Sequence, residues 1–585
     1  MHTSFRICAL RSVLVALAVL GAVGPADAMI TVGPASDTAC QYHDIGAAVQ
    51  AAANSPGFDL VAVSGTSWSA QTTITDHDPD GLTIEGGFAN CSAGISTGRT
   101  TLDGSGAVAA GPLIVHSGNG PLTLLHLILT NGKGAIQSVV AGPLTLSDVL
   151  VYFNNADYGG GLFVSGNDIF RMQLNLIGSS INSNTATRNG GGLYLSKVDV
   201  TISDGSNVVG NIAQGVATGS GDGGGIYALD SNIDIVDHSV PPFANVGSNY
   251  AQRNGGGIFF SSSQLRQELH LWNDRAAQPL WFDDNAASGT GGALYVSASG
   301  TDRQVESYAD IRNVRFTSNE SQQGAAIYAA ASGSGSFGIS AMVRLVQTVA
   351  GDVAPPCATG LECNAFDDNH ATSGSIIDLS SGGGPAHVSL LMSRASMRNN
   401  RAEELIGGSG YMGIDSSLFA SNELEIVAYN ISHDLRVSNS TIAYNTMTGD
   451  EMFLVALPPA SFELMHSLLV QSDANPVQAS NIGAGVPVTV RDLGILNVGV
   501  GQGTNVQFLT DPFVDASNGD FHIRATSSAV DRWGPSGDPL DTPPTVDLDG
   551  AMRPYQFNNP TTPYDFGAYE ADAVVDVIFR DGFDQ

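Results

Sequence analysis

The chain has 585 residues and a formal net charge of −33, from 56 acidic residues against 23 lysines and arginines. So acidic a surface repels nucleic acid and anionic lipid, and we expect neither as a partner. The 70 glycines and the charged fraction of 14% suit a β-structure that is rich in turns.

Residues 1–28 have the three parts of a secretory signal. Arg6 and Arg11 form a basic start, residues 13–23 form an apolar core, and the small residues 26–28 form a cleavage site. The apolar run is too short to span a membrane, and no later stretch offers about 20 uncharged apolar residues in succession. We therefore expect an exported chain, secreted or associated with the cell surface or outer membrane, with no transmembrane segment after signal removal.

The chain has five cysteines, of which Cys8 leaves with the signal. In an oxidising compartment the economical pairing of the others joins Cys40 to Cys91 and Cys357 to Cys363. The first bridge would staple the N-terminal region, and the second would pinch one loop. A zinc site is disfavoured because no histidine cluster accompanies these cysteines.

Residues 29–100 are predicted to form an N-terminal cap and the first coils of a repeat. Within them, residues 44–53 predict a short helix, because Asp44 can cap it and its apolar residues share one face. A helix in this position would cover an open strand edge and so prevent end-to-end association.

A marker of glycines followed by an aliphatic residue recurs through the middle of the chain. The aliphatic positions are Leu162, Leu193, Ile226, Ile258, Leu294 and Ile327. Their spacing of 31 to 36 residues is typical of a solenoid or another repeat architecture. The apolar stretches are short and bounded by Gly, Asn, Asp and Ser, which predicts strands rather than helical repeats. A propeller would require a cleaner period of about 40 to 50 residues.

A second marker places an apolar residue three positions before an asparagine. It occurs at Asn184, Asn211, Asn249, Asn285, Asn319, Asn369, Asn400, Asn422 and Asn445, and the last two steps shrink to 22 and 23 residues. Asparagine tolerates the left-handed backbone that a sharp turn requires, and stacked asparagines can hydrogen-bond from coil to coil. We therefore predict an all-β parallel β-helix over residues 101–510, with roughly 12–18 coils and a length of roughly 60–85 Å.

These markers resemble the repeats of right-handed parallel β-helix proteins, especially the passenger repeats of polymorphic outer-membrane proteins of the chlamydial type. The resemblance spans residues 100–450 and implies a right-handed coil. It implies little about chemistry, because the matching residues are architectural.

The pattern changes toward the C-terminus. The glycine marker fades after residue 330, and segment 332–365 is predicted to be a long loop or insertion. Residues 511–570 form a closing region rich in Pro, Asp and Gly, which resembles the C-terminal region of exported β-helix proteins with a choice-of-anchor type Q domain. Within the tail, residues 571–585, the segment 577–583 resembles short C-terminal tails of exported bacterial proteins. It is interpreted as a sorting signal or as a frayed or edge-covering strand.

Two sets of residues are candidates for ligand contact. The first is a pair of tryptophans, Trp272 and Trp281, which could stack on sugar rings or simply pack in the fold. The second consists of adjacent acids before turn asparagines, Asp283 with Asp284 and Asp367 with Asp368. Because neighbouring residues on a strand point to opposite faces, neither acid pair is a catalytic dyad by itself.

The residues suggest two functions from different classes. We expect a non-catalytic β-helix that presents a binding surface for adhesion or carbohydrate contact, because no catalytic set emerges from the repeats. The alternative is a polysaccharide lyase or glycoside hydrolase whose groove residues lie in irregular inserts around 262–282 or 335–365. We expect no cofactor beyond, at most, a single structural Ca²⁺ held by turn acids, and the oligomeric state stays open.

Overall fold

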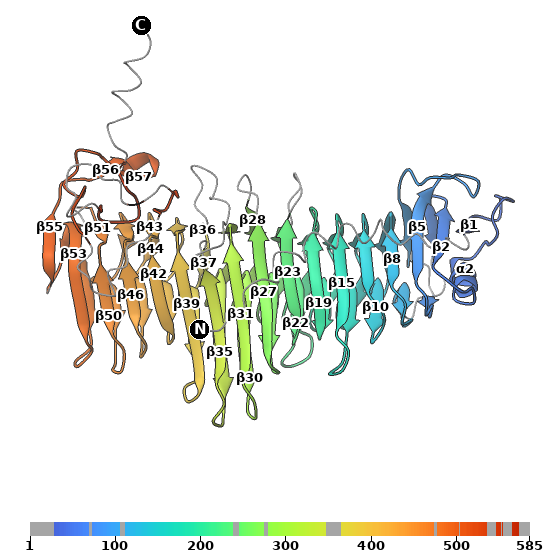
Figure 1. The fold of residues 1–585 in the computed structure, drawn as a ribbon, viewed down its shortest axis with the longest axis horizontal. Helices are drawn as coiled ribbons and strands as arrows, with labels where there is room; N and C mark the ends of the chain where they lie inside the picture. Colours follow the sequence, from blue (N-terminus) through green and yellow to red (C-terminus); the bar gives the residue numbers. More distant parts are fainter. Residues whose placement is uncertain are drawn as a thin grey trace, which may run out of the picture.

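The computed structural model describes residues 29–69, 73–105, 111–237, 245–273, 279–346, 364–472, 477–501, 503–534, 546–550, 553 and 564–571. Most of these residues lie in parallel strands stacked along one long axis (Figure 1). One sheet contains 15 strands in a single stack, and another contains 31 strands that occupy two further faces. At about 4.8 Å per strand, 15 strands extend about 67 Å, within the predicted length. The all-β parallel β-helix is therefore confirmed.

One coil illustrates how the chain makes a turn of the helix. Strand β15 (Met172–Ile177) lies on the first face, β16 (Ser180–Asn182) on the second, the two-residue β17 (Thr185–Ala186) at a corner, and β18 (Leu193–Ser196) on the third face. Each strand pairs in parallel with its counterparts in the coils before and after it. Alternate side chains point inward, and the inward ones are Leu, Ile, Val, Met and Phe, which fill one continuous core.

A column of ten asparagines runs down one corner of the coil. Its members are Asn154, Asn184, Asn211, Asn249, Asn285, Asn319, Asn369, Asn400, Asn422 and Asn445. Each of the first nine donates from its amide nitrogen to the amide oxygen of the next, at 2.9 to 3.1 Å. All ten side chains are buried. Because buried amides must find partners, this column sets the register from coil to coil.

The backbone conformation at this corner differs from the prediction. The left-handed residue is the one before the asparagine, as at Ser183 (φ 53°), Asp284 (φ 56°) and Asp368 (φ 56°). The asparagines of the column themselves have ordinary negative φ angles. The preceding residue turns the chain, so that the asparagine side chain can point into the coil and reach the next amide.

The glycine marker has two separate steric reasons. Gly255 begins its marker in the left-handed region at φ 67°, where a side chain would be strained. Gly256 has an ordinary φ, but a Cβ there would lie 2.3 Å from the carbonyl oxygen of Gly292 and 2.4 Å from that of Ala286. The corner is therefore closed to side chains wherever the marker is intact.

The N-terminal end of the core is covered as predicted. Helix α2 (Ile45–Ala52) is capped by Asp44, whose side chain accepts a hydrogen bond from the amide of Ala47 at 2.7 Å. Its buried face packs beside β1 (Met29–Val32) and β2 (Asp59–Ser64). A disulfide joins Cys40 to Cys91, which confirms that pairing; Cys357 and Cys363 lie outside the described residues. No helix in the described part of the chain is long and apolar enough to cross a membrane.

The C-terminal region lies against the outside of the coil (Figure 1). It covers apolar residues on the outer face of β43 (Leu418–Ala420), β47 (Thr441–Ala443) and β51 (Leu468–Val470). Phe513 and Trp533 are buried in this second core, which is separate from the one inside the coil. An antiparallel pair, β56 (Phe513–Asp515) and β57 (Asp520–Ile523), begins this region. The region predicted to close the helix therefore packs on its side.

Two segments expected to be irregular contain regular strands. Within 332–365, strand β35 (Ile339–Leu345) pairs on both sides and places four aliphatic residues in the core. Within 262–282, strand β27 (Arg266–Asn273) also pairs on both sides, and it places Leu269 and Leu271 in the core. For the described residues 332–346 the loop prediction was wrong, because the Gly- and Ser-rich sequence there marks a tight turn between two long strands; residues 274–278 and 347–363 lie outside the described residues. The alternative that placed groove residues in these inserts loses that basis over the described part of both segments.

Candidate functional site

Six aromatic side chains form a column on the outer surface of the 15-stranded sheet. They are Phe163, Tyr194, Tyr227, Phe259, Tyr295 and Tyr328, stacked with ring centroids 4.7 to 5.3 Å apart and interplanar angles of 4° to 13°. The spacing follows directly from the distance between parallel strands. Each inner ring presents its two faces to its neighbours, so those faces stabilise the stack and cannot stack on a ligand.

The column stops at Tyr328, on strand β34 (Ile327–Gly333). In the next coil the same register position is Asp378, on β38 (Ser375–Ser381). In the coil after that it is Gly407, on β41 (Glu404–Gly408). The last ring therefore faces a carboxyl group and then a position without a side chain.

The glycine marker breaks at the same coils. In the intact marker, Gly256 stands two residues before the core isoleucine Ile258. Ser375 holds that position before Ile377, and Glu404 holds it before Ile406, with the two paired in register. At a position that holds glycine or alanine in the preceding coils, these two coils carry a hydroxyl and a carboxyl.

Ser375, Asp378 and Glu404 are in direct contact. The Ser375 hydroxyl oxygen lies 3.2 Å from a carboxyl oxygen of Asp378 and 3.2 Å from one of Glu404. A hydroxyl has a single proton to donate, so both contacts are hydrogen bonds only when one of the two carboxyls is protonated. The cluster thus favours one shared proton.

The pKa values of the two carboxyls also favour a protonated carboxyl in this cluster. Burial raises the pKa of the Asp378 carboxyl to about 6. Burial, together with the neighbouring carboxylates of Glu403, Asp378 and Glu425, raises the pKa of Glu404 to about 7. No Lys or Arg of the described ranges forms an ion pair with Asp378 or Glu404. Half-buried acids without a counter-charge cost stability, and such costs concentrate at functional sites.

A hollow of about 220 Å³ opens on the corner next to this cluster. It is lined by His370, Thr372, Arg401, Glu403, Glu423, Glu425 and Thr448, among others. Two features create it. The chain from Asn369 to Ile377 spans eight residues, whereas that from Asn400 to Ile406 spans six. Arg401 makes only isolated bridges at the corner, so this coil lacks the short corner strand.

Trp272 lies elsewhere, on the first face. It is at the end of β27, with the Arg312 guanidinium 4.6 Å above its ring centroid and the His270 ring 4.8 Å away. The second tryptophan, Trp281, is on β28 (Leu280–Asp283), with the Arg315 guanidinium 5.4 Å from its ring centroid. Both rings therefore already have a cation packed against them.

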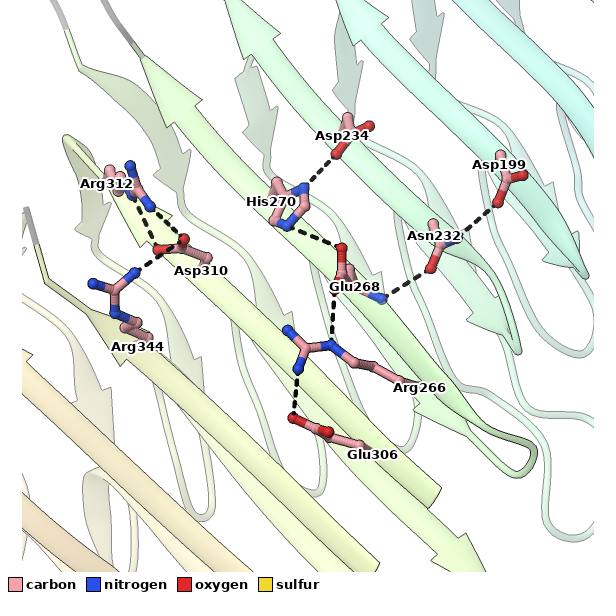
Figure 2. A network of polar contacts seen from close by, with 10 residues as sticks. All are labelled: Asp199, Asn232, Asp234, Arg266, Glu268, His270, Glu306, Asp310, Arg312 and Arg344. Atoms are coloured by element: carbon pink, nitrogen blue, oxygen red, sulfur yellow. Dashed lines mark hydrogen bonds and ion pairs between the residues drawn. The ribbon is translucent and has the colours of Figure 1, made fainter. Parts of the chain in front are cut away.

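Trp272 borders a network of charges that crosses five strands (Figure 2). Asp310 is buried between Arg312 at 2.7 Å and Arg344 at 3.4 Å. His270 bonds Asp234 at 2.7 Å; although burial acts to lower it, the carboxylates of Asp234 and Glu268 raise the pKa of His270. In Figure 2 each charged group points at an opposite charge or an amide on the same or a neighbouring strand. This network joins coils to one another, because its groups are already partnered.

The predicted acids do not converge either. Asp283 is half-buried on β28, and Asp367 is half-buried on β36 (Asn364–Asp367), with Thr317 between them in the same row. Two strand spacings separate them, about 10 Å. Asp284 and Asp368 occupy the exposed left-handed turn positions. Burial and the adjacent Asp284 raise the pKa of Asp283.

Sequence reasoning missed Ser375, Asp378 and Glu404. It registered the fading of the glycine marker but interpreted it as a loss of regularity. The useful signal was the identity of the substituting residues, a serine and a glutamate at a position that tolerates only glycine or alanine in the preceding coils.

In the described ranges the one group with metal-ligand spacing is Asp37 with Cys40 and Cys91. Its cysteines form the disulfide, and their sulfurs are therefore not available as thiolate ligands. Two acids near the C-terminal end, Asp547 and Asp549, have protein partners: Asp547 accepts a hydrogen bond from the backbone amide of Glu570, and Asp549 bonds the His522 ring.

No family model and no curated protein matches the chain. The fold itself, with its asparagine column and glycine corners, defines a parallel β-helix repeat protein. The handedness of the coil stays a prediction from the resemblance.

Proposed function

We propose that this chain is an exported β-helix protein that binds carbohydrate or another cell-surface component without turning it over. The supporting observation is the cluster of Ser375, Asp378 and Glu404 at the coils where both the aromatic column and the glycine marker stop. The finer kinships, to polymorphic outer-membrane protein repeats and to choice-of-anchor Q proteins, are part of the same proposal and rest on sequence resemblance.

The chemistry of this cluster suits a sugar. Carboxyl oxygens accept hydrogen bonds from the hydroxyl groups of a sugar, and Asp378 presents such a carboxyl next to the last tyrosine of the aromatic column. The adjacent hollow carries three glutamates against one arginine and one histidine. This charge disfavours uronates and sulfated glycans, so we propose a neutral sugar or an amino sugar as the ligand.

The test is binding of the chain without residues 1–28 to a glycan array, followed by calorimetry on the best ligand. Asp378→Asn and Glu404→Gln should each weaken binding at least tenfold, whereas Asp283→Asn is the matched control on another face and should leave it unchanged. Loss of binding in Asp283→Asn alone, or undiminished binding in both cluster variants, would refute the site.

A glycoside hydrolase is the second candidate, because the cluster contains two carboxyls with pKa values near 6 and 7. Both contacting oxygens lie 3.2 Å from one hydroxyl oxygen, so they are at most twice that distance apart. This upper limit on the distance between the two carboxyl oxygens is below the separation of about 6.5–9.5 Å in inverting glycosidases and is compatible with the separation of about 5–5.5 Å in retaining ones. A half-buried Glu404 with a pKa of about 7 suits a general acid.

The two candidates differ in one measurement. Reducing-end release and unsaturated-product formation should both be absent when the purified protein is incubated with the glycans that it binds. Turnover that Glu404→Gln abolishes while binding persists would establish the hydrolase instead.

A further inference from the structure

The two ends of the apolar core differ in how well they are covered. At the N-terminal end, α2 covers the core with a face of buried residues that includes Ile45 and Val49. At the C-terminal end, the last coils leave the core partly open. Four apolar residues there are only half-buried: Ile482, Val490, Val500 and Val506.

The strand edges at this end are also open in the described residues. The last strand, β55 (Thr504–Phe508), pairs with β53 (Val488–Leu496) on one side and with no described strand on the other. It pairs with residues 491–495 of β53, so residues 488–490 have no strand partner beyond them among the described residues. Val488 is 42% exposed and Phe508 is 85% exposed. Figure 1 shows β55 at the extremity, with β56 and β57 beside the coil rather than over its end.

This end is depleted in charge. Residues 477–510 contain two charged side chains, Arg491 and Asp492, against about five expected from the chain-wide fraction of 14%. Proteins that keep a strand edge free usually protect it with charges or proline, and β55 has neither. Loss of charge together with exposed apolar groups is the composition of an interface centre.

We propose that a second copy of this chain covers this end, so that two molecules pair tail to tail through β55. A twofold contact brings identical strands together antiparallel, which satisfies the free N–H and C=O groups of both edges. Two chains with a formal charge of −33 repel each other, so they can approach closely only where carboxylates are missing. Because α2 closes the other end, the contact produces a closed dimer and not a fibre.

The inference does not depend on the proposed function, because the cluster around Ser375 lies several coils before the end. In a dimer the two clusters would belong to one molecule twice as long, and both would stay exposed. Pairing would therefore add avidity toward a repetitive surface without altering either site.

The test uses the chain without residues 1–28. Light scattering across a concentration series measures its mass in solution, and small-angle X-ray scattering measures the length of the particle. We expect a concentration-dependent dimer, nearly twice as long as the monomer. Phe508→Lys and Val488→Lys should each give a monomer, because two like charges would meet at the contact. The matched control is Ile169→Lys, at a side chain 98% exposed on a turn, which should still dimerise. Circular dichroism and the melting temperature verify that each variant is folded.

Three outcomes overturn the proposal. The first is a wild-type monomer at every concentration, and the second is a dimer that persists in both edge variants. The third is a monomer that begins to associate only when the chain is shortened to end at Ala571. That result would mean that the chain's own residues 572–585 cover the edge.

Discussion

The coils between residues 184 and 328 and the two coils that follow use the same corner but carry different surface chemistry. In the first group, Gly256 and its counterparts keep the corner closed, and a row of stacked rings covers the adjacent surface. In the second group, Ser375 and Glu404 replace the glycine, Asp378 replaces the ring, and a hollow opens beside them. The asparagine column continues unbroken through both groups.

This difference separates the residues that build the coil from those free to change. The asparagine amides are buried and bonded on both sides, so their replacement would break the register of every coil beyond them. Side chains that point outward contact only those of the neighbouring coils. A change of residue type in such a row therefore alters the surface and leaves the core intact. Function is therefore to be sought where outward rows change and the column does not.

The largest expected effect is on the feature that both groups share. Asn249→Ala removes the acceptor for the backbone and side-chain amides of Asn211, and the donor to the carbonyl oxygen of Val208. We expect a loss of roughly 4 kcal/mol in the free energy of unfolding, because buried amide groups lose their partners. Chemical denaturation measures it. Asn175→Ala, which gives up one half-buried side-chain bond, is the control and should cost less than about 1 kcal/mol. Equal effects in the two variants would mean that the column is not what fixes the register.

An intermediate effect is expected when residues are exchanged between the two groups. Gly256→Ser should destabilise by roughly 3 kcal/mol, because its Cβ would meet two carbonyl oxygens at 2.3 and 2.4 Å. The reverse change, Ser375→Gly, should alter stability by less than about 1 kcal/mol while abolishing the contacts to Asp378 and Glu404. Thermal unfolding of both variants gives the comparison. If Gly256→Ser were as stable as the parent, the glycine would have no steric role.

The smallest expected effect concerns the pH dependence of the second group. Asp378 and Glu404 have folded-state pKa values of about 6 and about 7, above their ordinary values, so their charged forms are disfavoured in the fold. The protonated forms of the two carboxyls therefore contribute fully to stability below about pH 4, and this contribution is lost as the pH rises through 6 and 7. At pH 8, Asp378→Asn should stabilise by roughly 2 kcal/mol and Glu404→Gln, which solvent screens more, by about 1 kcal/mol.

The measurement for this pair is unfolding as a function of pH. Both variants should show a flatter profile than the parent between pH 4 and pH 8. Asp302→Asn, at an exposed acid, changes the net charge equally and should leave the profile unaltered. A parent profile that is flat through pH 6 and 7 would mean that the two carboxyls are not strained by burial.

The sequence by itself determined the coil, its corners and its N-terminal cover. Asparagine and glycine recur because the same corner geometry is needed in every coil, and a local steric requirement is visible in one dimension. The pairing of Cys40 with Cys91 was predicted from their position in the cap and from the expected oxidising compartment, and the structure contains it. Even at the corners, however, the left-handed residue proved to be the one before the asparagine, since the side chain of the asparagine is committed to the column.

Only the tertiary structure decided what lies outside the coil. Ser375 and Glu404 are in contact because the chain between them makes one full turn of the β-helix. The number of residues per turn varies from coil to coil, so the contact cannot be predicted from a fixed spacing in the sequence. The docking of Trp533 and Phe513 on the outer face of β47 and β51 depends likewise on segments about 70 residues apart finding a common apolar surface. Inward positions repeat because every coil must fill the same core, whereas outward positions depend on which neighbours each coil happens to have.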